Sequence, residues 1–168
     1  MSTEEHRRRA GQPAVRCGVI TVSDTRGADD DPGGDLIASL LADAGHAIAG
    51  RRWARDDVQQ VRGALNGLIF QELCEVVILT GGTGIARRDT TYEAVEPLLA
   101  KRMDGFGELF RAFSFDEVGP AAMLSRALAG VYHDRLVFAL PGSVNGVRLA
   151  MTKLIVPELA HLLWEVQR

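Results

Sequence analysis

The sequence contains little cysteine. Cys17 and Cys74 are its only two cysteines, both stand among apolar residues, and neither belongs to a C-x-x-C pair or a Cys/His ligand spacing. A disulfide framework and a cysteine-based metal or redox site are therefore disfavoured. We expect both thiols to be reduced, buried and structural.

Long apolar runs are also lacking. No stretch approaches the roughly 20 apolar residues that a membrane-spanning helix needs. The first residues, MSTEEHRRRAGQP, contain no apolar segment of the kind found in a signal peptide. These absences predict a cytoplasmic protein without a membrane partner.

Basic charge is not in excess, since the formal net charge is -3. A protein that follows a nucleic-acid backbone normally shows a net basic face or stripe. Nucleic acid is therefore not expected as a partner, whereas a local phosphate-binding site is compatible with this charge.

The chain has enough apolar residues for one core. With 168 residues, 46% of them hydrophobic, it is too short for two ordinary domains but long enough to bury one. Residues 1–13 are charged and show no apolar periodicity, which predicts a disordered tail. A single domain is expected over residues 14–168.

Strand-like and helix-like patterns alternate along the chain. Runs of β-branched and apolar residues predict buried strands at residues 15–23, 47–54, 75–80 and 136–140. Helical apolar spacing follows each of the first three strands and recurs over residues 105–119 and from about Asn145. This alternation predicts an α/β fold with a mostly parallel sheet covered by helices on both faces.

A polar loop follows each predicted strand. These loops read SDTR, RDD, TGGTG and PGS, in chain order. The carboxyl ends of parallel strands lie at one edge of a sheet, and open α/β sheets bind their ligands there. The sequence therefore predicts one composite site, assembled from loops that are far apart in the chain.

The glycine-rich loop after the third strand indicates an anion site. Gly81, Gly82 and Gly84 lack side chains, so their backbone N–H groups are open to an anion. The helix predicted from about Thr91 adds a positive N-terminal end, and Arg88 adds a charge-assisted donor. These features favour a phosphorylated ligand over a turn that merely reverses the chain.

Two familiar nucleotide motifs are absent. The third glycine of G-x-G-x-x-G would fall at Arg87, and no G-x-x-x-x-G-K-[ST] sequence occurs. The predicted phosphate site therefore belongs to neither a dinucleotide fingerprint nor a P-loop.

Two aspartates near this loop have more than one possible role. Thr90 and Glu93 have the spacing of a capping box that starts a helix at about Thr91. Asp89 and Asp56 each stand where a helix cap or a site carboxylate would stand. If both project to one rim, they are suited to hold Mg²⁺ against phosphates, which points to phosphoryl or nucleotidyl transfer.

Other polar residues are interpreted as structural. The adjacent aspartates Asp29–Asp31 are expected to be solvated in a loop rather than to form a second cation site. His46, His133 and His161 have no paired nucleophile or base in view.

Five segments together match one known pattern. TGGTGIARRDTTYEA, residues 80–94, has TGGTG, three variable residues, Arg-Asp, and Thr before a Glu-Ala pair. ITVSDTRG, DGFGELFRAFSFDEVG, MLSRALAG and FALPGS stand around it in a matching order. Over about residues 15–165 the chain resembles the MoaB/MogA family of molybdenum cofactor biosynthesis proteins, most closely MoaB.

The resemblance implies a three-layer α/β/α fold that assembles into homotrimers or homohexamers. It also implies that the protein binds molybdopterin and adenylylates its phosphate with ATP and Mg²⁺, releasing pyrophosphate. A catalytically inactive carrier or scaffold of the same pathway is the alternative. Other proteins of molybdenum cofactor biosynthesis are the further partners that it implies.

The resemblance assigns residues as well. Asp56 and Asp89 match the family's acidic residues and are the expected catalytic and Mg²⁺-binding pair. The expected substrate-binding residues are Ser23, Asp24, Gly81, Gly82, Thr83, Gly84, Arg88, Glu93, Ser125, Pro141, Gly142 and Ser143.

Overall fold

The fold is built on one mixed sheet. A computed structural model describes residues 13–168, so the tail expected over residues 1–13 falls almost entirely outside the described residues. Within that range, six strands have the order β2-β1-β3-β6-β5-β4. The strands are β1 (Arg16–Val22), β2 (Ala47–Ala54), β3 (Val76–Thr80), β4 (Lys101–Arg102), β5 (Leu128–Tyr132) and β6 (Arg135–Leu140).

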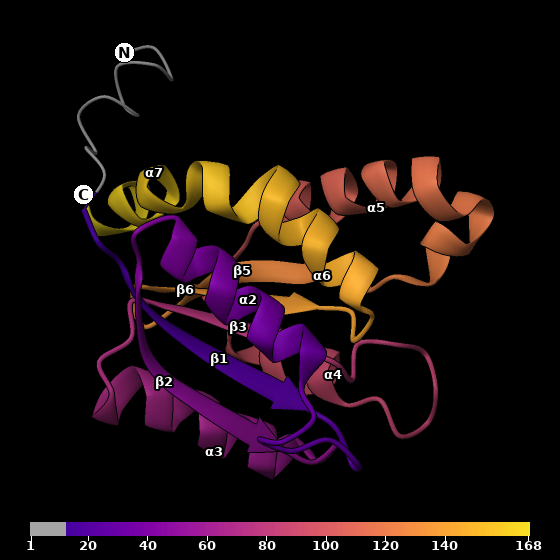
Figure 1. Cartoon of the computed structure of the whole chain (residues 1–168), viewed down its shortest axis with the longest axis horizontal. Coiled ribbons are helices and arrows are strands. Elements are labelled where there is room, and N and C mark those ends of the chain that lie inside the picture. Colours follow the sequence, from indigo (N-terminus) through magenta and orange to yellow (C-terminus); the bar gives the residue numbers. More distant parts are fainter. Residues whose placement is uncertain (1–12) are drawn as a thin grey trace.

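Helices cover both faces of the sheet. The main helices are α2 (Pro32–Asp43), α3 (Val58–Asn66), α4 (Thr91–Val95), α5 (Asp104–Val118), α6 (Val144–Ala150) and α7 (Val156–Gln167). Helices α2, α5, α6 and α7 lie on one face, and α3 and α4 on the other (Figure 1). This arrangement confirms the predicted α/β fold. No helix within residues 13–168 is long and apolar enough to cross a membrane.

Short tighter or wider helical turns extend several of these helices. A π-helical turn, η1 (Gly67–Gln71), continues α3, and a second, η4 (Met151–Ile155), joins α6 to α7. The 3₁₀ segments η2 (Glu96–Leu98) and η3 (Gly119–Leu124) continue α4 and α5. Each 3₁₀ segment contains a proline near its start, which removes a backbone donor and ends the α-helical pattern.

The central strands are apolar on both sides because helices cover both sides. In β3, Val76 and Ile78 pack into the core beneath α2, α5, α6 and α7, whereas Val77 and Leu79 pack into the core beneath α3 and α4. Alternate residues of a strand point to opposite faces, so this single run serves two cores. Strands β2, β1, β3 and β6 run parallel, which brings the four polar loops to one edge.

The far edge of the sheet differs from the sequence prediction. Strand β5 pairs antiparallel with both β4 and β6, and the sequence patterns predict neither β4 nor β5. The hairpin from β5 to β6 turns through His133 and Asp134, whose φ angles are 48° and 57°. The Asn-Gly or Asp-Gly signal that usually marks such a hairpin is therefore missing.

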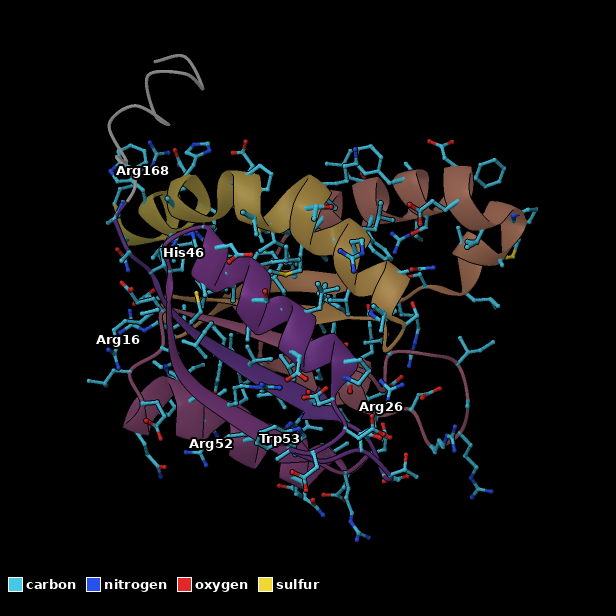
Figure 2. The ribbon with its side chains drawn as sticks, viewed as in Figure 1. Arg16, Arg26, His46, Arg52, Trp53 and Arg168 are labelled. Atoms are coloured by element: carbon cyan, nitrogen blue, oxygen red, sulfur yellow. The ribbon has the colours of Figure 1, made fainter. Side chains whose placement is uncertain are left out.

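The cysteines lie in the interior, as predicted. Cys17 and Cys74 are free and buried. Burial raises the pKa of Cys17 to about 12 and that of Cys74 to about 11, so neither is a reactive thiolate near neutral pH. His46 accepts a hydrogen bond at Nδ1 from the Val15 N–H at 3.2 Å. It lies toward the opposite end of the sheet from Arg26 (Figure 2).

The prediction that Asp29–Asp31 are solvated is wrong for Asp31. Asp29 and Asp30 are exposed, but Asp31 is only 2% exposed. Its carboxylate has four partners: Thr21 Oγ1 (2.6 Å), the Gly34 N–H (2.9 Å), Arg51 Nη2 (2.9 Å) and Trp53 Nε1 (3.0 Å). Asp31 is the N-cap of α2, and a cation from β2 makes its burial tolerable.

These partners set the ionisation of Asp31. Burial acts to raise the pKa of this carboxyl, but hydrogen bonds from Thr21, Gly34, Trp53 and Arg51 outweigh it and hold the pKa below its ordinary value. A carboxyl with a lower pKa in the folded chain stabilises the fold above its unfolded pKa. That stabilisation is lost as the pH falls through the folded pKa.

Replacing Asp31 by Asn is therefore expected to lower the free energy of unfolding by about 2 kcal/mol near neutral pH, because charge-assisted hydrogen bonds are lost. The difference from wild type should shrink progressively below about pH 4, where the wild-type carboxyl also takes up a proton. Urea unfolding across this pH range measures both effects. Asp30→Asn is the control, and an equal loss of stability in both variants would contradict the prediction.

Candidate functional site

Two adjoining cavities open at the carboxyl ends of the parallel strands. The first, of about 430 Å³, lies between the glycine loop (residues 81–90), the end of α5 and the start of α6. The second, of about 270 Å³, lies between the loops that follow β1, β2 and β3. Gly82, Asp89 and Gly142 line both cavities, so the two spaces meet there.

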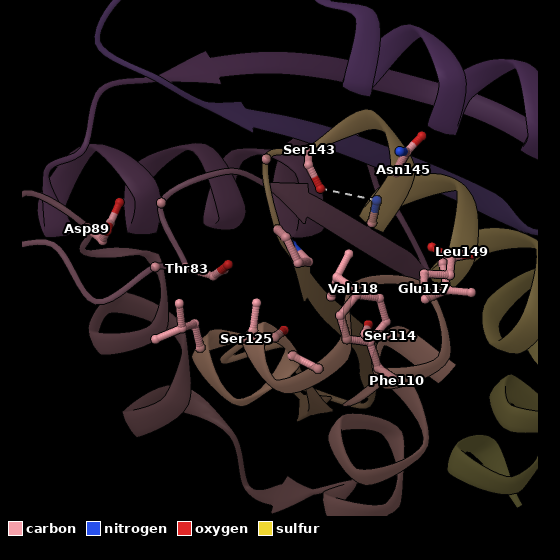
Figure 3. Close-up of a pocket in the computed structure, with 18 residues that line it drawn as sticks. Thr83, Asp89, Phe110, Ser114, Glu117, Val118, Ser125, Ser143, Asn145 and Leu149 are labelled. Atoms are coloured by element: carbon pink, nitrogen blue, oxygen red, sulfur yellow. Dashed lines mark hydrogen bonds between the residues drawn. The ribbon is translucent and has the colours of Figure 1, made fainter. Parts of the chain in front are cut away.

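The first cavity has apolar walls with hydroxyl groups between them. Phe110 from α5 and Leu149 from α6 supply apolar surface. Thr83, Ser125 and Ser143 come from three different segments and surround the same space (Figure 3). Pockets of this kind hold organic ligands whose few polar atoms meet a few fixed polar groups.

The second cavity is acidic. Asp24, Asp56 and Asp89 line it together with Arg26 and Arg88. Burial, and then the charges of Asp24 and Asp89, raise the pKa of Asp56, which Arg88 and a hydrogen bond from the Thr90 backbone offset only in part. Asp56 Oδ1 is buried and has no hydrogen-bond partner within residues 13–168. A buried oxygen without a hydrogen-bond partner lowers the stability of the fold unless a cation or a donor group of a ligand binds to it.

Two glycines at the end of β3 let the backbone pass between β1 and α4. Gly81 and Gly82 have positive φ angles of 94° and 67°. A Cβ at Gly81 would lie 2.2 Å from the Val22 carbonyl oxygen, and one at Gly82 would lie 2.4 Å from both Asp56 Oδ1 and Thr91 Oγ1. The Thr91 hydroxyl donates to the Gly81 carbonyl at 2.8 Å. Both the turn and the close approach therefore require glycine.

Neither site aspartate is a helix cap. The N-cap of α3 is Asp57, and that of α4 is Thr90, so the capping role that the sequence allows for Asp56 and Asp89 is excluded. One oxygen of Asp89 accepts a hydrogen bond from the Ala86 N–H at 2.8 Å. Asp89 thus shapes the glycine loop while it lines both cavities.

The predicted capping box does not form. Helix α4 begins at Thr91, as expected, but the Thr90 hydroxyl makes no capping hydrogen bond and is buried without a partner in the described part of the chain. The Glu93 carboxylate forms an ion pair with Arg126 instead. A guanidinium offers two charge-assisted donors, which a single backbone N–H cannot match.

Arg126 contacts the glycine loop of the site, although its sequence context does not reveal this. It donates through Nε to the Thr83 carbonyl at 3.0 Å and through Nη2 to the Gly84 carbonyl at 2.6 Å. Its guanidinium also lies 4.9 Å from the centroid of the Tyr92 ring. The Ser-Arg pair before β5 is the one sequence signal, and such a pair is equally typical of an ordinary turn.

The structure brings nearly all the predicted site residues together. Glu93 is the exception, since its carboxylate is paired with Arg126 and it lines neither cavity. The residues that line the cavities are Ser23, Asp24, Asp56, Gly81, Gly82, Thr83, Gly84, Arg88, Asp89, Ser125, Pro141, Gly142 and Ser143.

Comparison with known proteins decides the family. The family profile described as a probable molybdopterin binding domain matches residues 18–161. Molybdenum cofactor biosynthesis protein B from Halalkalibacterium halodurans is 47% identical over 167 residues, which is 99% of this chain and 98% of the relative. The chain belongs to the MoaB/MogA family of molybdenum cofactor biosynthesis proteins.

Solved MoaB structures share this fold. A crystal structure of molybdenum cofactor biosynthesis protein B superposes with a TM-score of 0.90 at 45% identity, over 94% of this chain and 99% of that one. The tungsten cofactor synthesizing protein MoaB from Pyrococcus furiosus gives 0.84 at 41% identity, over 92% and 98%. The family resemblance inferred from the sequence motifs is thereby confirmed, and this chain carries the family's molybdopterin-binding domain.

The fit at Gly82 predicts a large effect of a single methyl group in this MoaB-family chain. Gly82→Ala should be destabilised by more than about 2 kcal/mol, because a left-handed backbone conformation and a clash with Asp56 add together. Differential scanning calorimetry measures the loss. Gly27→Ala, on the neighbouring loop, is the control, since no atom lies within 4 Å of a Cβ there. Equal melting temperatures for the two variants would refute the prediction.

Proposed function

We propose that this chain binds molybdopterin and transfers an adenylyl group from ATP to its terminal phosphate. The observation that carries the proposal is the junction of the two cavities at Gly82, Asp89 and Gly142. A phosphate at the junction borders an apolar pocket on one side and an acidic pocket on the other. A ring with a phosphate and a nucleoside triphosphate therefore meet there with their phosphates adjacent.

The first cavity is the proposed pterin pocket. Phe110 and Leu149 supply apolar walls for a flat ring, while Thr83, Ser125 and Ser143 offer hydroxyls to ring nitrogen and oxygen atoms. Its volume of about 430 Å³ is suited to a ligand of this size. The glycine loop then receives the phosphate.

The second cavity is the proposed site for the phosphates of ATP. Arg26 and Arg88 line it and are suited to donate charge-assisted hydrogen bonds to phosphate oxygens. Ser23 and Thr25 line it from the loop after β1 and offer further hydroxyls. The three carboxylates of the same cavity repel phosphates unless a cation lies between them.

The carboxylates fit Mg²⁺ that is shared with phosphates. Asp56 and Asp89 both line the second cavity, which places two hard oxygen ligands beside phosphates held there. Within residues 13–168, no three acidic, His or Cys groups converge into a metal cluster, so the chain has no complete metal cage of its own there. Mg²⁺ is commonly held by one or two carboxylates plus substrate phosphates. Asp56 and Asp89 would hold it, and the ion would neutralise phosphate charge.

The proposed reaction needs no covalent intermediate with the protein. An oxygen of the molybdopterin phosphate bonds to the α-phosphorus of ATP, and the bond from that phosphorus to the oxygen bridging to the β-phosphate breaks. The products are adenylyl-molybdopterin and pyrophosphate. The chain's own residues therefore act by alignment and charge, with loop N–H groups and Arg88 facing the anionic oxygens.

Replacing Asp89 by Asn tests this proposal. Pyrophosphate release from molybdopterin, ATP and Mg²⁺ should fall by at least about 100-fold, whereas the Kd for molybdopterin should change less than about threefold. Asp56→Asn should behave in the same way. Asp30→Asn is the matched control, since Asp30 is an exposed carboxylate that lines neither cavity.

Three outcomes separate the alternatives. Full turnover by Asp89→Asn would remove this carboxylate from the proposed mechanism. If the wild-type protein bound molybdopterin but released no pyrophosphate, a carrier or scaffold of the same pathway would replace the enzyme. Failure to bind molybdopterin at all would contradict both functions.

We also propose that copies of the chain associate through an apolar surface on α5 and η3. Its exposed side chains are Leu109, Phe113, Phe115, Val118, Met123 and Leu124. Leu109 and Phe113 stand one helical turn apart on α5 and line one apolar cavity with Leu154 and Leu162, and an exposed apolar patch of this kind marks a protein–protein contact. The family resemblance implies a homotrimer or a homohexamer for such a contact.

Phe113→Asp is expected to shift the protein toward monomer, because a carboxylate would lose its hydration in that contact. Light scattering coupled to size exclusion measures the mass. Leu73→Asp is the control, since Leu73 is 60% exposed on the loop before β3, away from α5. An unchanged mass for Phe113→Asp would argue against this surface.

A further inference from the structure

Arg126 contacts the glycine loop without lining the first cavity. Thr83 and Gly84 line that cavity, whereas Arg126 lines a separate one, of about 380 Å³, between α5, β5 and Tyr92. From there it donates to the Thr83 and Gly84 carbonyls at 3.0 and 2.6 Å. The guanidinium therefore fixes two successive carbonyls of the loop on its own side.

Fixing the direction of these carbonyls also fixes the direction of the N–H group in the same peptide unit. The described peptide bonds are all trans, and in a trans peptide the N–H points opposite to the C=O. Arg126 at the Thr83 carbonyl thus turns the Gly84 N–H away from itself, and at the Gly84 carbonyl it turns the Ile85 N–H away. Hydrogen bonds within residues 13–168 give neither N–H an acceptor. The loop therefore presents two neighbouring backbone donors.

Arg126 is itself held on two sides. Its guanidinium forms an ion pair with Glu93 and lies 4.9 Å from the Tyr92 ring centroid. Both partners are on α4, which packs beside the glycine loop. A planar guanidinium donates in fixed directions, so holding it fixes the carbonyls that it contacts. A lysine ammonium cannot serve two carbonyls and a carboxylate in one plane.

We infer that Arg126 is a positioning residue that aims the N–H group of Gly84, a residue that lines the first cavity, at the phosphate of the ligand there. The inference rests on the proposed function, since a phosphorylated pterin is taken as the ligand. Glu93 lines neither cavity, and its role is then to orient the Arg126 guanidinium.

Hydrogen exchange without ligand tests the loop contact. In Arg126→Gln, the hydrogen-bonded amides of Ala86 and Asp89 should exchange at least about tenfold faster while β3 remains protected. Arg111→Gln is the matched control, because Arg111 lines the same cavity and makes a 3.5 Å contact with the Ser125 carbonyl. Unchanged exchange in Arg126→Gln would overturn the inference, whatever the protein binds.

Binding of two fluorescent pterins tests the phosphate. One carries the side-chain phosphate, and the other is the same pterin after phosphatase treatment. Arg126→Gln and Arg126→Lys should raise the Kd for the phosphorylated pterin at least about tenfold and that for the dephosphorylated pterin less than about twofold. An equal loss for both would overturn the inference, because Arg126 would then support the pocket as a whole.

Glu93→Gln separates positioning from direct contact. If Arg126 acts through the loop, releasing it from Glu93 should weaken binding of the phosphorylated pterin several-fold. If Arg126 bound the phosphate itself, the same change would leave binding unchanged or strengthen it, which would overturn the inference. Should the wild-type protein bind neither pterin, the proposed function fails together with the ligand inferred here, while hydrogen exchange still decides whether Arg126 orders the loop.

Discussion

Gly82 has room for a hydrogen atom and for nothing larger. A Cβ there would lie 2.4 Å from Asp56 Oδ1 and from Thr91 Oγ1, so three segments meet at this point: the end of β3, the loop after β2 and the start of α4. The contact brings Asp56 under the backbone of the glycine loop, where one of its oxygens is buried. The acidity of the second cavity and the path of the loop both depend on this contact.

Two aspartates at the same edge of the sheet show opposite electrostatic behaviour. Asp31 is buried with four donors around its carboxylate, and its pKa is lowered. Asp56 keeps a buried oxygen without a donor in the described chain, and its pKa is raised. A carboxylate with all its oxygens hydrogen-bonded stabilises a fold, whereas a buried oxygen without a partner lowers its stability and is typical of functional sites. This difference identifies Asp56 as a candidate for function and Asp31 as structural.

Sequence patterns predicted the parallel part of the sheet because burial on both faces leaves a clear signature there. The run Val76–Thr80 is apolar throughout, and the polar loops stand out at the strand ends. Strand β6 was predicted from its apolar run, but the hairpin that joins it to β5 gave no turn signal, because the turn uses His133 and Asp134 without glycine. Because parallel strands end at the same edge of a sheet, the polar loops could be assigned to one edge without predicting any side-chain contact.

Side-chain partners were harder to predict than strands. Asp31 differs locally from its two exposed neighbours only in standing before Pro32 at the N-cap of α2, and its cation comes from Arg51 on another strand. The spacing of Thr90 and Glu93 fits a capping box, yet Arg126, 33 positions after Glu93, takes the carboxylate. The pocket residues of α5, such as Phe110, have the same helical spacing as core residues. Sequence patterns do not predict these side-chain contacts, because each contact depends on a segment that is distant in the chain.

The short length of α4 explains why the glycine loop needs side-chain support. The sequence suggests a helix whose positive end would attract an anion, but α4 has only five residues before it tightens into a 3₁₀ turn. So few aligned peptide dipoles provide little field. The backbone N–H groups of the loop must then be oriented individually by side-chain contacts. Thr91 fixes the Gly81 carbonyl, Asp89 fixes the Ala86 N–H, and Arg126 fixes the two carbonyls between them. The geometry of this backbone site is therefore encoded in side chains that face the loop.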